Sequence, residues 1–124
     1  MKIEEQVLSR EQMKHLQELG ADTSDASMCW AGNDVVPNNG AAFDLGYDGI
    51  PTYTIGDLIE KLPKSIDLGF GEYDLELSTK GEYVEVQYEN DYDDYTPFFC
   101  ANLSLIESLY RILCWLAENH KELL

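Results

Sequence analysis

The chain has 124 residues and a formal net charge of −16 at pH 7, from 24 acidic and 8 basic side chains. Its length is usual for one domain, and a hydrophobic fraction of 44% with eight Tyr, four Phe and two Trp can build a core and argues against disorder. The charge excludes proteins that bind nucleic acid or anionic membranes directly through a basic surface.

The sequence carries no recognisable membrane or export signal. No apolar run approaches the roughly 18 residues of a membrane span, and the N-terminus lacks the apolar stretch of a signal peptide. The three cysteines, Cys29, Cys100 and Cys114, are odd in number and lack C-x-x-C spacing. We therefore expect a cytoplasmic protein with reduced, buried or half-buried thiols.

The N-terminal half is predicted to form a helix followed by strands. An S-x-x-Q capping box at Ser9 predicts a helix over about 10–19. Strands are expected over 27–31 and over 41–45. The turn-rich residues 35–40 would connect these two strands.

The middle of the chain is predicted to form a short helix and a β-hairpin. Thr54, with an acid three residues later, caps a helix over about 55–62. The segments on either side of Lys80-Gly81 alternate between apolar and polar residues, so we expect a hairpin over about 73–88 that turns at these two residues. The facing apolar pairs would be Tyr73–Tyr88, Leu75–Val86 and Leu77–Val84.

Half of the net charge lies on this hairpin and the loop after it. Residues 72–94 hold nine acidic side chains against one basic side chain, Lys80. The expected turn places Glu76 opposite Glu85, Glu72 opposite Glu89, and Asp74 opposite Gln87. Like charges that face each other cost up to about 1 kcal/mol per pair, so we expect a mildly self-repelling outer face. The predicted partner-binding residues are Glu72, Asp74, Glu76, Glu85, Glu89 and Tyr92.

A third helix is predicted over about 103–119, beginning at Asn102 or at Ser104. Apolar residues cover well over half of its circumference, which indicates the most buried helix of the fold. The expected architecture is therefore α+β: a single domain over 1–124, in which about three helices pack on one face of an antiparallel sheet.

Three segments carry a resemblance to a known family. Residues 16–30 resemble the opening of a family of small uncharacterised proteins encoded by gut bacteria and their mobile elements, and residues 50–64 and 113–119 resemble its middle segment and C-terminal helix. The shared residues mark helix boundaries and core positions. The resemblance implies the fold and assigns no activity.

Candidate catalytic and metal-binding residues are few. His15 and His120 have no partner at metal-ligand spacing, and Cys100 has no recognisable base, so surface histidines and a core cysteine are expected. Gly69-Phe70-Gly71 lacks the sequence context of a phosphate loop. The loop 91–94 has closely spaced carboxylates but not the glycine and glutamate of an EF-hand, so a solvated loop is expected, with weak calcium binding as the alternative. We expect no catalytic residue, no bound metal and no cofactor.

Three classes of function follow. The first is a non-enzymatic interaction protein whose acidic hairpin face binds a basic protein, with nucleic-acid mimicry or modulation of host defence as narrower versions. The second is a small metal-dependent or hydrolytic enzyme without a recognisable motif. The third is a domain whose charge only maintains solubility. Direct binding of nucleic acid or membrane is not expected.

Overall fold

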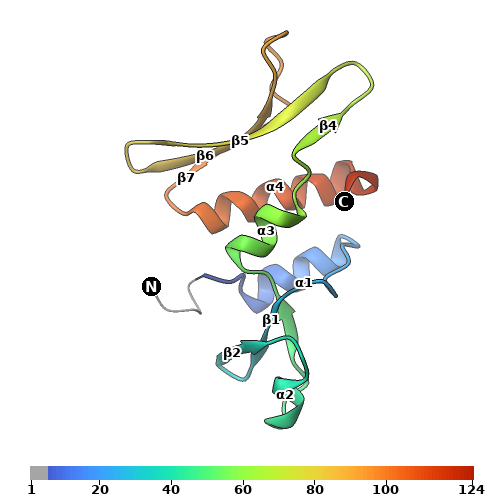
Figure 1. Ribbon diagram of the computed structural model, residues 1–124, viewed down its shortest axis with the longest axis vertical. Coiled ribbons are helices and arrows are strands. Elements are labelled where there is room, and N and C mark those ends of the chain that lie inside the picture. The colour runs from blue at the N-terminus through green and yellow to red at the C-terminus, as the bar shows by residue number, and fades with distance from the viewer. Residues whose placement is uncertain (1–5) are drawn as a thin grey trace. The chain divides into compact units, whose positions relative to one another are not determined.

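The computed structural model describes residues 6–124 (Figure 1). Helices and antiparallel strands are mixed along the chain, which confirms the α+β class. The chain divides into two compact units, one ending at Ile59 and the other beginning at Glu60. The expected single domain over 1–124 stays a prediction. Within the described residues, no helix is both long enough and apolar enough to cross a membrane.

The N-terminal unit is built around a small antiparallel sheet with the strand order β2-β1-β3. Helix α1 lies next to β3. The elements are α1 (Arg10–Glu18), β1 (Met28–Ala31), β2 (Asp34–Pro37), α2 (Ala41–Asp44) and β3 (Ile50–Thr52), and α3 (Ile55–Lys61) crosses the junction between the units.

Both predicted caps in this region are present. Ser9 Oγ accepts a hydrogen bond from the Gln12 backbone at 3.1 Å, and Gln12 Oε1 accepts one from the Ser9 backbone at 2.9 Å. Thr54 and Asp57 make the same reciprocal pair at 3.0 Å each. The caps satisfy backbone donors that a helix leaves unpaired at its start. The two helices accordingly begin as predicted and end one residue earlier than expected.

Two predictions for this unit are wrong. Residues 41–44 form helix α2 and not a strand, because the chain reverses at Gly40 (φ +96°) and continues into two alanines, the residue of highest helix propensity. Part of the expected turn 35–40 instead belongs to strand β2. Gly32, with φ +63°, opens a two-residue turn that lets β2 pair with β1, which is confirmed as a strand.

The C-terminal unit contains an antiparallel sheet with the strand order β4-β5-β6-β7 (Figure 1). Helix α4 lies against β6 and β7. The elements are β4 (Ser65–Asp67), β5 (Glu72–Lys80), β6 (Tyr83–Glu89), β7 (Phe98–Asn102), α4 (Leu105–Asn119) and the 3₁₀ turn η2 (Lys121–Leu123). The expectation of one sheet is wrong, since the described strands form two sheets and each unit pairs its strands locally.

The predicted hairpin exists, but its register differs by two residues. Lys80 pairs with Tyr83, so the turn is Gly81-Glu82 and not Lys80-Gly81. Gly81 has φ +61°, and a glycine at the first central position is typical of a type II′ turn, whereas the expected turn required a positive φ at a lysine. The observed pairs include Leu75–Tyr88, Leu77–Val86 and Thr79–Val84. A shift of two residues keeps every side chain on its predicted face.

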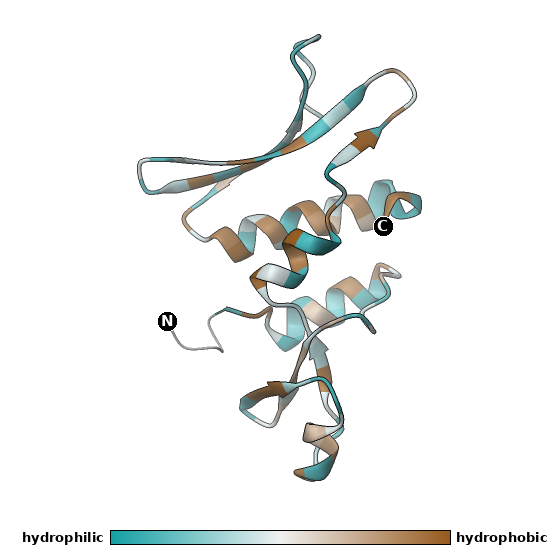
Figure 2. Cartoon of the chain, in the orientation of Figure 1, coloured by the Kyte–Doolittle hydropathy of each residue, from teal (hydrophilic) through white to brown (hydrophobic). Residues whose placement is uncertain are grey.

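Helix α4 supplies the core of the C-terminal unit. Ser104 Oγ accepts a hydrogen bond from the Glu107 backbone at 3.3 Å, which selects Ser104 over Asn102 as the cap. Leu109, Leu113 and Leu116 are completely buried, as predicted. Figure 2 shows the hydrophobic residues spread around much of α4, in contrast to the hydrophilic stretches of the hairpin.

Leu113→Ala should lower the free energy of unfolding by about 2–5 kcal/mol, because it removes a fully buried side chain and leaves a cavity against the sheet. Leu103→Ala is the matched control, since Leu103 is 65% exposed, and it should change stability by less than about 0.5 kcal/mol. Urea denaturation of both variants measures the difference. Equal losses would place this face of α4 outside the core.

Candidate functional site

The outer face of the hairpin carries most of its carboxylates. Side chains on β5 and β6 alternate, so burial of Tyr73, Val86 and Tyr88 on one face directs their neighbours to the other. Cross-strand partners on this outer face are Asp67 with Glu72, Asp74 with Glu89, Glu76 with Gln87, and Ser78 with Glu85. We call the carboxylates of this surface the acidic face: Asp67, Glu72, Asp74, Glu76, Glu85 and Glu89.

The observed register corrects the predicted charge pairs. Glu76 does not face Glu85, because the two-residue shift places it opposite Gln87. The facing carboxylates are instead Asp74 and Glu89 on the hairpin, and Asp67 and Glu72 between β4 and β5. The outer face is therefore self-repelling, as expected, but through different pairs.

Part of the acidic face forms a cleft of about 320 Å³. We call it the acidic cleft; its lining residues are Glu72, Asp74, Glu76, Glu89, Asn90, Asp91 and Tyr92. Five of the six predicted site residues are thus brought together. The sixth, Glu85, lies outside the cleft and accepts a hydrogen bond from Ser78 Oγ at 3.4 Å.

Glu89 is the carboxylate most perturbed by this arrangement. It is half-buried at the end of β6, whereas Asp74 and Glu76 are exposed. Partial burial, a hydrogen bond shared with Glu76, and the negative charges of Glu76 and Asp91 raise the pKa of Glu89 above its usual value of 4.5. A positive charge placed in the cleft would relieve this repulsion.

The loop after β6 is held by Asn90, whose importance the sequence does not reveal. Its side-chain amide donates to the Glu72 carbonyl at 2.9 Å, and its Oδ1 accepts from the backbones of Tyr92 and Asp93 at 3.0 Å each. These bonds tie the loop to the start of β5. Asp91 and Tyr92 are thereby kept beside the strand carboxylates.

A cluster of three aromatic rings fixes the other end of the loop. The rings of Phe70, Tyr73 and Tyr95 lie 5.7–6.3 Å apart, edge to face. Tyr73 Oη donates to Asp93 Oδ2 at 3.3 Å, and burial together with this carboxylate raises the pKa of the Tyr73 phenol. Tyr92 takes no part in the cluster and is 95% exposed at the cleft.

The loop 91–94 does not assemble metal ligands with its neighbours. Both oxygens of Asp93 accept hydrogen bonds, from Tyr73 and from the Tyr95 backbone. Across residues 6–124, no three His, Cys, Asp or Glu side chains are grouped so that they could hold a metal ion.

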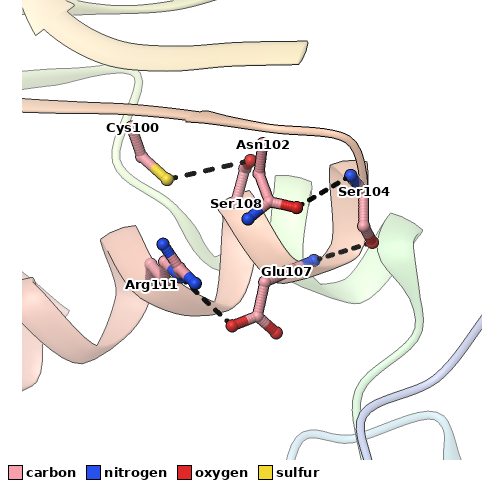
Figure 3. Close-up of polar contacts among 6 residues, drawn as sticks. All are labelled: Cys100, Asn102, Ser104, Glu107, Ser108 and Arg111. Atoms are coloured by element: carbon pink, nitrogen blue, oxygen red, sulfur yellow. Dashed lines mark hydrogen bonds and ion pairs between the residues drawn. The ribbon is translucent and has the colours of Figure 1, made fainter. Parts of the chain in front are cut away.

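Cys100 lies in a polar cluster at the start of α4 (Figure 3). Its Sγ is 3.9 Å from Ser108 Oγ, and both residues are buried. Arg111 Nε donates a hydrogen bond to Glu107 Oε1 at 3.1 Å, and this bond raises the pKa of the Arg111 guanidinium. The Glu107 carboxylate is therefore engaged by the arginine. Burial of Cys100 agrees with the predicted core position.

Comparisons of the chain with protein-family models, curated proteins and solved structures found no match. The resemblance to the gut-bacterial family stays a prediction.

Glu89→Gln should stabilise the protein near neutral pH. Because the folded-state pKa of Glu89 is raised above 4.5, the folded state binds this proton more readily, and stability is lost as the pH rises from 4.5 through the raised value. Glutamine cannot ionise, so the variant should melt at a higher temperature than the parent at about pH 7, and the gap should close below about pH 4. Thermal unfolding of the variant and the parent at both pH values measures this difference in melting temperature. Glu82→Gln, in the exposed turn, is the control; a gain for Glu89→Gln that is the same at both pH values would contradict the charge argument.

Proposed function

We propose that this protein is a non-enzymatic interaction protein that binds a basic protein partner through the acidic face. The observation that carries the proposal is the acidic cleft, in which five carboxylates line one concavity without any basic residue among the lining side chains. Clustered carboxylates of this kind raise the local concentration of cationic groups and steer their approach. The proposal assigns the protein to the cytoplasm and gives it no catalytic role.

The spacing of the carboxylates suits a partner that presents several cationic side chains. Along β5, carboxylates occupy every second position, at Glu72, Asp74 and Glu76. Neighbouring carboxylates therefore emerge from the strand about 6.6 Å apart. Glu89 comes from the neighbouring strand and supplies a second row. Lysine and arginine side chains on an extended segment repeat at a similar interval, and each could reach a carboxylate.

Tyr92 gives the cleft a contact of a different kind. It is almost fully exposed beside the acids, on a loop held by Asn90. Exposed aromatic rings add contact area at low entropic cost and attract cations to their faces. The narrower hypotheses of nucleic-acid mimicry and modulation of host defence place the same surface against a protein whose basic groups normally bind phosphates.

Glu76→Gln combined with Glu89→Gln should weaken binding of a ten-residue lysine peptide about tenfold or more at low salt, since it removes two adjacent cleft charges. The matched control is Glu18→Gln combined with Glu118→Gln, which removes the same charge from two exposed helical positions. Fluorescence anisotropy at low and moderate ionic strength compares the two pairs.

The two pairs of substitutions separate a binding site from a general charge effect. If the control pair lowers the affinity for the lysine peptide as much as the cleft pair does, only the net charge matters. That result would favour a domain whose charge only maintains solubility. The cleft pair also removes the repulsion between Glu76 and Glu89, so it should not destabilise the fold. A loss of affinity without a loss of melting temperature therefore cannot come from misfolding.

A further inference from the structure

A second cleft lies in the N-terminal unit, on the surface of the small sheet. Its volume is about 310 Å³, near the lower end of the range for small-molecule sites. Its walls are Trp30 from β1, Tyr47 from the loop after α2, and Ile50 from β3, with Arg10 from α1 and Asp48 beside them. None of the residues that line this cleft belongs to the acidic face.

Trp30 is held in a fixed orientation at this cleft. Its Nε1–H donates to the Leu8 carbonyl at 3.0 Å, and the same oxygen accepts a bond from Thr52 Oγ1 at 2.7 Å. Tyr47 packs closely over Gly32, where a Cβ atom would lie 3.0 Å from the tyrosine ring. The aromatic walls are therefore set by the turn between β1 and β2 and by the chain entering α1.

Arg10 presents a cationic group at the cleft. Its guanidinium carbon lies 5.4 Å from the centre of the Trp30 ring, a cation–π distance. Its Nε is buried without a hydrogen-bond partner. Among residues 6–124, no carboxylate lies within ion-pair distance of Arg10. A planar guanidinium stacked on an indole ring is suited to a carboxylate.

Asp48 supplies the opposite charge at the same cleft. It lines the cleft, is exposed, and makes no ion pair with Arg10. The cleft thus has one cation, one anion and apolar or aromatic walls. The complementary ligand has a carboxylate, an ammonium group and an apolar body.

We propose that the Arg10–Trp30 cleft binds a free α-amino acid with an aromatic or large aliphatic side chain. Arg10 receives the carboxylate and Asp48 the ammonium group, while Trp30, Tyr47 and Ile50 surround the side chain. The site is independent of the acidic face, so each proposal can fail without the other.

Phenylalanine, N-acetylphenylalanine and phenylalaninamide test the proposal, because the second compound lacks the ammonium group and the third lacks the carboxylate. Titration of each to about 10 mM, followed by the indole N–H resonance of Trp30, gives the three affinities. We expect saturable binding of phenylalanine, and affinities about tenfold lower or worse for the two blocked compounds, since each loses a charge-assisted contact. Trp115, in the C-terminal unit, provides an internal control resonance.

Substitutions assign the two charges. Arg10→Gln and Arg10→Lys should both weaken the binding of phenylalanine. Arg111→Gln, which removes the same charge from an arginine paired with Glu107, should leave this affinity unchanged. In Asp48→Asn the preference for phenylalanine over N-acetylphenylalanine should disappear. Unchanged resonances elsewhere in the spectrum show that each variant is folded. Absence of a Trp30 shift with phenylalanine, equal affinities for the three compounds, or full binding by folded Arg10→Gln would each overturn the proposal.

Discussion

The alternation of side chains along β5 and β6 is the constraint on which the C-terminal unit depends. Val86 and Tyr88 are completely buried, and α4 lies against the strand that carries them. A slip of one residue would expose these side chains and bury Asp74, Glu76 and Glu89 in their place. The position of the carboxylates is therefore determined by the packing of the opposite face. The same hydrophobic burial that stabilises the sheet arranges the charges of the candidate site.

The acidic cleft also shows a conflict between stability and binding. Glu89 lies close to Glu76 and Asp91, and these neighbours raise its pKa. Repulsion of this kind destabilises the folded state without a partner and is relieved by a cation. Asn90 and the aromatic rings of Phe70, Tyr73 and Tyr95 hold the loop in place despite the repulsion. The cleft is thus preorganised by contacts that do not themselves involve its carboxylates, which reduces the entropy lost on binding.

Local signals in the sequence were sufficient for part of this structure. The capping residues Ser9, Thr54 and Ser104 identify three helices because each cap acts within four residues. The side of the sheet on which each acidic side chain of the hairpin lies was also predictable. A two-residue error in the position of the turn leaves the alternation of inward and outward side chains unchanged. The turn itself was misplaced because the position of Gly81 within it depends on backbone angles. The pairing of strands into two sheets, and the anchoring role of Asn90, depend on contacts between distant residues that no local pattern encodes.

The two clefts differ in how solvent acts on their charges. Four of the five carboxylates that line the acidic cleft are exposed, so its attraction for cations falls steeply with ionic strength. At the Arg10–Trp30 cleft, the guanidinium is half-buried and stacked on an indole ring, where salt screens less and orientation matters more. The first surface therefore suits rapid encounter with a flexible basic chain, and the second suits recognition of one small molecule by shape. In a chain of net charge −16, Arg10 has no carboxylate within ion-pair distance among residues 6–124, and general electrostatics explains this feature least because the same residues contain many acids.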